Sequence, residues 1–451
     1  MSSATKKTNL TLRILIGMCA GIIIGLILQF MRSTFGDGKD LVISLFGLDF
    51  SVYGFFVENI FHIGGTIFVN SLKMLVVPLV FVSLVCGVSS LSDPKKLGRL
   101  GGKSVSLYLL TTAIAVTGAI VAALLVKPGE KFDIGADAVF EPKEAPGLAQ
   151  VIIDMFPSNP IASMADGNML QIIVFSILVG IAMSLAKESG TKVRQGFEFL
   201  NDVIMKIVTI IMELAPYGVF FLIAKLASTL EFNAFYNIAK YFILVFILLI
   251  LHGIITYPIL LKVFTGLNPI KLMIKMKDAA LFAFSSSSSN ATLPITLATA
   301  EKKLGVDNSV ASFTIPLGAT INMDGTAIMQ GVATVFIAQA YGVDLSMAQL
   351  LMVILTATLA SVGTAGVPGV GLIMLAMVLQ QVGLPVEGIG LIIGIDRLLD
   401  MTRTVVNITG DCTVTCIVAK SEKSLDEDIY NNMDLEDEIA SDELQHLTEK
   451  S

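Results

Sequence analysis

Long apolar stretches separated by short polar segments occupy the chain between Ile14 and Val263. A helix needs about 20 apolar residues to cross the hydrocarbon core of a bilayer, so each stretch predicts one transmembrane helix. Phe55–Gly65 is too short to span alone, and we interpret it as the start of the second helix. The predicted spans are Ile14–Met31, Ile67–Ser90, Ser104–Val126, Leu170–Ala186, Phe199–Leu226 and Tyr241–Val263.

The pattern changes after the sixth span, where the apolar runs become interrupted. Phe284–Pro294 reads FSSSSSNATLP and Ser361–Gly371 reads SVGTAGVPGVG. Serine competes for backbone hydrogen bonds, whereas glycine and proline break the helical ladder. Irregular backbone at membrane depth is tolerated only where protein or water surrounds it, so we interpret both segments as tips of re-entrant helical hairpins. Each hairpin precedes a full span, Asn308–Tyr341 or Glu387–Ala419, and the hairpin–helix unit therefore occurs twice, with inverted topology.

Composition agrees with a membrane protein, since 54% of the residues are hydrophobic and only 15% are charged. A soluble protein would carry about a quarter charged residues. The predicted fold class is an all-α polytopic membrane protein with eight transmembrane helices and two re-entrant hairpins. Its surrounding partner is the lipid bilayer, and we expect no nucleic-acid partner. The net charge of -7 is carried largely by residues 421–451, which are predicted to form an acidic, disordered cytoplasmic tail.

Basic residues alternate between loops and predict the orientation of the chain. The basic loops contain Lys95, Lys96, Arg99, Lys103, Lys187, Lys192, Arg194, Lys262, Lys271, Lys275 and Lys277. The intervening loops, Lys127–Asp166 and Ser228–Asn237, are acidic or nearly neutral. Because positively charged loops face the cytoplasm, both termini are predicted to be cytoplasmic. His252, within the sixth span, is interpreted as a packed structural histidine.

The most informative segment is the last predicted span, which contains DRLLDMTRTVVNITGD. Asp396, Asp400, Arg403 and Asn407 are four, three and four residues apart, so they share one helical face, and Asp411 extends it. A charge at the bilayer centre costs roughly 2.5–3.5 kcal/mol, so such a cluster predicts a partner, an ion or a substrate. The alternative is a set of internal ion pairs, such as Asp396 with Arg403. Two arginines cannot neutralise three carboxylates, however, and a face with both charges suits a zwitterionic solute.

Three weaker clusters accompany this face. Asn322–Thr326 reads NMDGT, where Gly325 would let the helix unwind and expose oxygen ligands for Na⁺; the alternative is a solvated kink. The serine-rich tip offers half-helix ends and free N–H groups to an anion; the alternative is a flexible polar linker. Tyr108, Thr111 and Thr112 lie one turn apart, although embedded threonines usually bond their own helix.

The motifs together resemble the dicarboxylate/amino acid:cation symporters, the glutamate transporter family. The resemblance is carried by LKMLVVPLVF, the serine-rich tip with ATLP, NMDGT, GTAGVPG and D-x-x-x-D-x-x-R-T-x-x-N-x-x-G-D, in the family's order and up to about Lys420. It implies a homotrimer that works by an elevator mechanism. The symporter domain would span 1–420, with a scaffold mainly in 10–103 and 127–229 and a moving transport part mainly in 104–126 and 232–420.

The resemblance also implies a substrate site. Arg403 would bind the substrate's side-chain carboxylate in bidentate fashion, together with Thr326, and Asp400 would bind its ammonium. Asn407 and Thr404 would bind backbone groups of the substrate, and the two hairpin tips would close over it. The substrate-binding residues implied are Ser289, Thr326, Val367, Gly371, Asp400, Arg403, Thr404 and Asn407.

Three sodium sites are implied in the same way, with Na⁺ as the coupling ion. The first would use Asp411 with carbonyls of Gly318, Asn322 and Asn407. The second would lie beneath the outer hairpin tip and use Thr320, Ser361, Val362 and Thr364. The third would use Tyr108, Thr111, Thr112, Asn322 and Asp324.

The chain departs from the family pattern at four positions. A second arginine near the substrate is common in the family, but its two usual positions are Ser287 and Met401 here. Asn290 stands where serine is usual. Gln330 stands where the proton-coupled animal carriers have glutamate, which argues against proton coupling through that position.

The predicted function is sodium-coupled uptake of aspartate or glutamate across a bacterial inner (plasma) membrane, since the long outer insertions of animal relatives are missing. The alternative within the family is a carrier of C4-dicarboxylates or neutral amino acids. Asp400 argues against the first of these and Arg403 against the second. A channel is less favoured because the charges converge on one place. An enzyme is not expected, because the sequence has no metal triad, activated nucleophile or phosphate loop.

Overall fold

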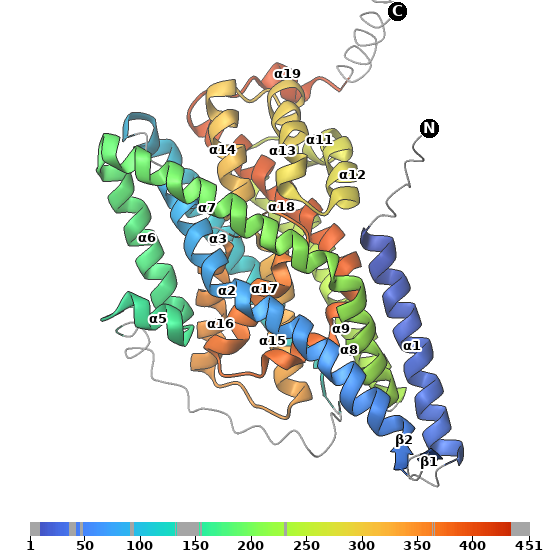
Figure 1. Ribbon diagram of the computed structural model, residues 1–451. Coiled ribbons are helices and arrows are strands. Elements are labelled where there is room, and N and C mark those ends of the chain that lie inside the picture. The colour runs from blue at the N-terminus through green and yellow to red at the C-terminus, as the bar shows by residue number, and fades with distance from the viewer. Residues whose placement is uncertain are drawn as a thin grey trace, which may run out of the picture.

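The structure is a computed structural model that describes residues 10–35, 42–45, 48–90, 94–130, 132, 153, 156–229, 232–362, 364 and 366–433. Within these residues the chain is helical, as predicted, apart from one short antiparallel hairpin of β1 (Val42–Leu45) and β2 (Leu48–Ser51). The sequence did not predict this hairpin. The helices form an elongated bundle (Figure 1).

The first half of the chain supplies long apolar helices. Four helices among the described residues are long and apolar enough to cross a membrane, and a fifth results if one bent pair is taken as a single span. The π-helical turn η1 runs directly into α2, which confirms that Phe55–Gly65 begins the second helix. The elements are α1 (Leu10–Phe35), η1 (Gly54–Phe61), α2 (His62–Ser90), α3 (Pro94–Val126), α5 (Pro160–Asp166), α6 (Met169–Leu185), α7 (Lys187–Glu213), α8 (Ala215–Thr229), α9 (Phe232–Leu251), η2 (His252–Thr256) and α10 (Tyr257–Thr265).

The predicted fifth span, Phe199–Leu226, is not one straight helix. α7 ends at Glu213, α8 begins at Ala215, and the two are bent by 47°. Pro216 explains the break, because proline has no backbone N–H to donate and its ring clashes with the preceding turn. The carbonyl of Pro216 also lies against Gly17 of α1, where an added Cβ would approach it to 2.3 Å.

The second half contains a turn between two packed helices at each predicted tip, α12 with α13 and α16 with α17. Ser287 has a positive φ of 52° between α12 and α13, and the Ser288 side chain caps α13 by accepting from the Ala291 N–H. Gly369, with φ 83°, precedes α17 in the second hairpin. The elements are α11 (Pro269–Lys275), α12 (Lys277–Ser286), α13 (Ser289–Ala298), η3 (Thr299–Lys303), α14 (Asn308–Ile321), α15 (Asp324–Ala340), α16 (Met347–Ser361), α17 (Val370–Gln381), η4 (Val386–Leu391), α18 (Ile393–Ser421) and α19 (Glu427–Asn431).

The two hairpin tips meet inside the molecule. The Ser288 hydroxyl donates to the Gly366 carbonyl at 2.6 Å, and the Asn290 N–H donates to the same oxygen at 3.1 Å. Figure 1 shows α12 and α13 in the upper part of the molecule and α16 in the lower part. The hairpins therefore approach one another from opposite ends.

The predicted span Asn308–Tyr341 is divided into α14 and α15. The backbone leaves the helical conformation at Asn322 (ψ 94°) and Met323 (φ −120°). The expected unwinding is therefore present, and it falls at Asn322 and Met323, while Gly325 lies in the first turn of α15. An added Cβ at Gly325 would lie 2.7 Å from the Arg403 carbonyl, so this glycine permits close packing of α15 on α18.

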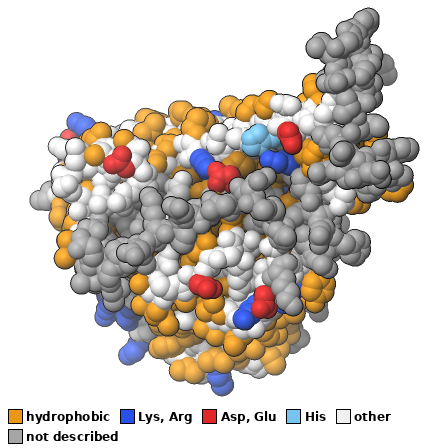
Figure 2. Space-filling view, turned by 90° about the horizontal axis from the view of Figure 1, so that it is seen from below, with side chains coloured by type: hydrophobic (Ala, Val, Ile, Leu, Met, Phe, Trp, Pro, Cys, Tyr) orange, Lys and Arg blue, Asp and Glu red, His pale blue; other side chains and the backbone are white. Residues whose placement is uncertain are grey.

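Packing separates the helices into two sets. α1 packs along α8, and α2 packs against α6, α7 and α8. α3 packs on α15 and α16, while α18 is enclosed by α9, α10, α12, α14 and α15. Seen from below, hydrophobic side chains form much of the outline, as expected for a surface facing lipid (Figure 2).

The C-terminal segment is more ordered than predicted. Residues 422–433 contain α19, which packs on α11 and η3, so the expectation of disorder from residue 421 was wrong for this part. Tyr430 is fully buried, and Lys275 donates to the carbonyls of Lys303, Ile429 and Tyr430 at 2.7, 2.7 and 3.0 Å. Residues 434–451 lie outside the described part of the chain.

Candidate functional site

The polar face of α18 is buried in the centre of the second helix set. Asp396, Asp400, Arg403, Asn407 and Asp411 are each at most 8% exposed. They lie on one continuous helix, as the spacing predicted. A helix that buries two acids beside an arginine must pair these groups, because unpaired charges are costly away from water.

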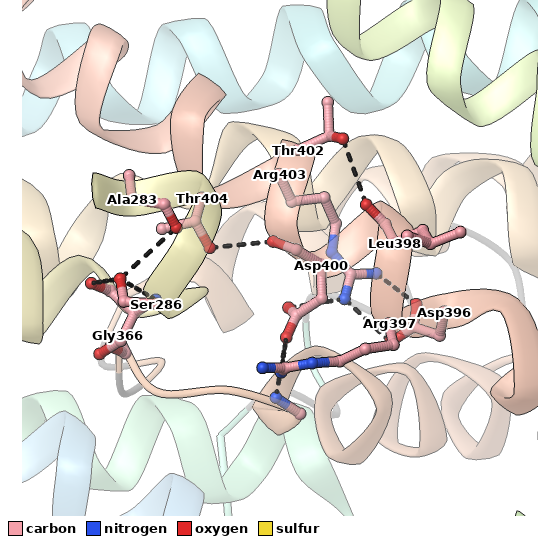
Figure 3. Close-up of polar contacts among 12 residues, drawn as sticks. Ala283, Ser286, Gly366, Asp396, Arg397, Leu398, Asp400, Thr402, Arg403 and Thr404 are labelled. Carbon is pink, nitrogen blue, oxygen red and sulfur yellow. Dashed lines mark hydrogen bonds and ion pairs between the residues drawn. The ribbon is translucent and has the colours of Figure 1, made fainter. Parts of the chain in front are cut away.

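Arg403 is the centre of this face and one of the largest fully buried side chains described. Its Nη1 and Nη2 donate to the two carboxylate oxygens of Asp396 at 2.6 and 3.0 Å, and Nη2 also donates to Asp400 Oδ1 at 2.8 Å. The internal Asp396–Arg403 pair considered from the sequence is therefore present (Figure 3). The Arg403 Nε–H has no hydrogen-bond partner among the described residues, which leaves a buried donor available.

Asp400 lies between two arginines. Its Oδ1 accepts from Arg403, whereas its Oδ2 accepts from the Gly369 N–H at 3.2 Å and lies 3.4 Å from Arg397 Nη1. Figure 3 shows the two guanidinium groups approaching this carboxylate from different sides. The sequence reasoning assigned no role to Arg397, although its position three residues before Asp400 could have indicated the contact.

A small cavity of about 20 Å³ adjoins these groups. All eight residues predicted to bind substrate line it: Ser289, Thr326, Val367, Gly371, Asp400, Arg403, Thr404 and Asn407. Ser287 and Met323 line it as well, and the Ser287 hydroxyl is buried without a partner among the described residues. This volume suits about one water molecule, so a larger solute requires the two hairpin tips to separate.

The first and third predicted cation sets converge beside the unwound residues. Asn322 Nδ2 donates to Asp411 Oδ1 at 2.9 Å and to the Asn407 carbonyl at 3.0 Å. Gly318 belongs to the same cluster, since an added Cβ there would lie 2.5 Å from Asp411 Oδ1. The Thr111 hydroxyl lies 3.5 Å from Asn322 Oδ1, which connects the two sets.

Asp324 carries the remainder of the third set. The Thr112 hydroxyl donates to Asp324 Oδ1 at 2.6 Å, and the hydroxyls of Thr111 and Thr112 both donate to the Tyr108 carbonyl. Two contacts were missed from the sequence: the Tyr257 hydroxyl donates to Asp324 Oδ2 at 2.9 Å, and His252 Nε2 lies 3.2 Å from the same oxygen. His252 is the first residue of the π-helical turn η2 and Tyr257 directly follows it, and this turn offered no sequence signal.

The second predicted cation set is not joined by hydrogen bonds in this way. Thr364 Oγ1 donates to the Ala360 carbonyl, and the Ser361 hydroxyl donates to Thr358, so these contacts stay near the end of α16, where Val362 follows. The Thr320 hydroxyl donates to Pro316 within α14. The described residues contain no group of three or more His, Cys, Asp or Glu that could hold a metal. The groups gathered around Asn322 are carboxylate, carbonyl, hydroxyl and amide oxygens, a donor set that suits hard cations.

Two hairpins that meet beside an unwound helix and a buried, charged cavity define a class of protein. Broken helices in paired repeats, with a binding site at their junction, are typical of secondary transporters. The chain is thus a multi-pass membrane protein with the architecture of a solute carrier.

Comparison with known proteins gives the family. The model of the Sodium:dicarboxylate symporter family matches residues 10–421, and the chain belongs to this family. It is 33% identical to the Proton/glutamate-aspartate symporter of Escherichia coli (strain K12), over 93% of this chain and 94% of that protein. It is 34% identical to the Proton/sodium-glutamate symport protein of Bacillus caldotenax, over 94% and 97% of the two chains. It is 35% identical to the Excitatory amino acid transporter 3 of Mus musculus, over 84% and 82%.

Proposed function

We propose that the protein takes up an acidic amino acid, aspartate or glutamate, in symport with Na⁺. The observation that carries this proposal is the arrangement around Arg403. One carboxylate, Asp396, holds two of its N–H groups, while a second, Asp400, holds only one. The names of the relatives, which refer to glutamate, aspartate and sodium, support the same substrate class.

The geometry supplies a route by which a zwitterion binds. The substrate ammonium would donate to the Asp400 carboxylate and break the hydrogen bond between Arg403 Nη2 and Asp400 Oδ1. The substrate's side-chain carboxylate would occupy that edge and the unpartnered Nε–H, giving a bidentate contact. A buried donor without a partner costs about 1–3 kcal/mol, so satisfying Nε adds to the affinity for a carboxylate.

Coupling to Na⁺ would use the oxygen-rich groups beside the cavity. The first set would comprise Asp411 with oxygens of Gly318, Asn322 and Asn407, and the third set would comprise Asp324 with Tyr108, Thr111, Thr112 and Asn322. The second set, with Thr320, Ser361, Val362 and Thr364, would form only when the outer hairpin closes on its solute. Each cation and the substrate then favour the same closed state, so each raises the other's affinity.

The transport movement proposed is an elevator within a homotrimer of eight transmembrane helices per subunit. Leu281, Phe282 and Phe284 on the first hairpin are 69%, 42% and 39% exposed, whereas α17 of the second hairpin is buried and contacts α2. Lys73 of α2 also pairs with Glu387 at 2.7 Å. This asymmetry supports a state in which the site faces the cytoplasm of a bacterial inner membrane, with both termini on that side.

In inside-out vesicles, a membrane-impermeant maleimide should label Leu281→Cys; labelling only in right-side-out vesicles would reverse the orientation.

The proposed function is tested by uptake of radiolabelled aspartate into proteoliposomes. We expect accumulation that requires an inward Na⁺ gradient and that unlabelled glutamate abolishes, while serine and succinate have little effect. Accumulation driven by a proton gradient alone would replace Na⁺ by H⁺ as the coupling ion. Inhibition by serine or succinate rather than by glutamate would assign the chain to a different substrate class of the family.

A further inference from the structure

Arg397 is a buried cation beside the candidate substrate site that the proposed binding scheme leaves without a task. It follows Asp396 on α18, and its side chain is 9% exposed. Its Nη1 lies 3.4 Å from Asp400 Oδ2, on the carboxylate oxygen that Arg403 does not use. Arg403 and Arg397 therefore approach the two oxygens of the Asp400 carboxylate from the same helix.

The surroundings of Arg397 are mostly apolar. Together with Asp396 and Asp400 it lines a cavity of about 30 Å³, which is separate from the substrate cavity. The apolar walls come from α1, α2, α8 and the end of α7, and include Ile14, Phe68, Leu72, Met212 and Val219. Burying a guanidinium among apolar side chains is costly unless acidic groups balance its charge. We infer that the nearby aspartates hold Arg397 close to the candidate substrate site.

The charges of this cluster balance only when Arg397 is counted. Asp396 and Asp400 contribute two negative charges, and Arg397 and Arg403 contribute two positive charges. Without Arg397 the cluster would carry one net negative charge. An acidic amino acid brings one further net negative charge, and charge interactions over a few ångströms are strong where water is excluded.

We propose that Arg397 is a positioning residue that determines selectivity for acidic over neutral amino acids, acting through Asp400. Arg397 stays in contact with Asp400 Oδ2 while Asp400 Oδ1 exchanges its hydrogen bond from Arg403 for one from the substrate ammonium. Arg403 can then donate to the side-chain carboxylate of the substrate. The charge of Arg397 also keeps the cluster of two aspartates and two arginines neutral before the substrate enters. This inference rests on the proposed function, because it assumes that Asp400 and Arg403 bind the solute.

The test compares aspartate with its neutral isostere asparagine in proteoliposomes. Arg397→Met should raise the KM for aspartate about tenfold or more with a small change in kcat, as expected when a charge-assisted contact is lost. Inhibition by asparagine should change little, so the aspartate-to-asparagine selectivity falls by a similar factor. Arg397→Lys, which keeps the charge, should retain part of the selectivity. Arg99→Met, which removes an arginine from an exposed ion pair, is the matched control.

Moving the positive charge of Arg397 to position 401 distinguishes the effect of its charge from the effect of its side-chain packing. Met401 lies four residues after Arg397 and therefore on the same face of α18, so Arg397→Met combined with Met401→Arg keeps one cation on that face. We expect this double variant to recover aspartate selectivity. Equal losses for aspartate and asparagine in Arg397→Met, or no recovery in the double variant, would overturn the inference. If Arg397→Met does not fold, unchanged selectivity in both Arg397→Lys and the double variant overturns it.

The two proposals fail in different ways. Wild-type protein that does not accumulate aspartate would overturn the proposed function, and this inference with it. Normal wild-type uptake with unchanged selectivity in Arg397→Met would overturn the inference alone.

Discussion

Replacement of Arg403 by lysine tests whether the fork of this guanidinium binds the substrate. Among the described residues the Nη groups of Arg403 make three hydrogen bonds, two to Asp396 and one to Asp400, and its Nε–H has no partner. Lysine keeps the positive charge but has only three N–H donors and no planar fork. The two aspartates would use those donors, so the substrate carboxylate would lose its bidentate partner while the cluster charge stays the same.

The magnitude follows from the bonds lost. A hydrogen bond to a charged group contributes about 1.5–3 kcal/mol, and about 1.4 kcal/mol is a tenfold change in affinity. Loss of one such bond should therefore weaken aspartate binding roughly ten- to hundredfold, and loss of both should weaken it further.

The assay is aspartate binding to purified protein at saturating Na⁺, measured by calorimetry and by the shift in thermal unfolding temperature. Arg99→Lys, at an exposed ion pair with Glu422, is the control for a general effect of the substitution. An aspartate affinity in Arg403→Lys within twofold of wild type would refute the assignment of the guanidinium edge to the substrate.

Three further substitutions probe the surrounding structure. Asp411→Asn removes the only carboxylate of the first cation set, so the Na⁺ concentration for half-maximal uptake should rise severalfold; an identical Na⁺ curve would exclude this site. Gly325→Ala places a Cβ 2.7 Å from the Arg403 carbonyl, and should displace α15 from α18 and reduce uptake more than it reduces expression. Glu422→Gln removes an ion pair at the end of α18, where the hydrogen bond from Lys103 holds the pKa of Glu422 below its ordinary value. Because a lowered carboxyl pKa stabilises the fold above that value, wild type should unfold at a higher temperature than this variant at neutral pH, and the difference should vanish as the pH falls through the lowered pKa.

Much of the fold follows from local sequence properties. Apolar length predicted long helices in the first half, although the fifth stretch is bent after Glu213, and clusters of serine, glycine and proline predicted the turns after α12 and before α17, because these residues weaken a helix wherever they occur. The face of α18 was predicted equally well, since helical spacing alone brings Asp396, Asp400 and Arg403 together.

The features missed from the sequence depend on tertiary contacts. The break at Asn322–Met323 was predicted, whereas the close packing of Gly325 on the Arg403 carbonyl was not. His252 and Tyr257 reach Asp324 from another helix, and their spacing alone cannot show that. The acidic composition after residue 421 suggested disorder, because one buried residue, Tyr430, carries little weight in an average over the segment, and its contact with Lys275 is a tertiary one.

The contacts of Asn322 and Asn407 give a physical reason for cations and substrate to bind together. Asn322 presents its Nδ2 group to the Asn407 carbonyl and to Asp411 Oδ1, which are two oxygens that the first cation would require. A cation entering there must displace this amide, whose oxygen faces Thr111 of the third set. Asn407 in turn lines the substrate cavity and accepts from the Gly325 N–H through its side chain at 2.8 Å. If the proposed sites are occupied, the groups that rearrange for the cation also contact the substrate, and the coupling between them would require no long structural pathway.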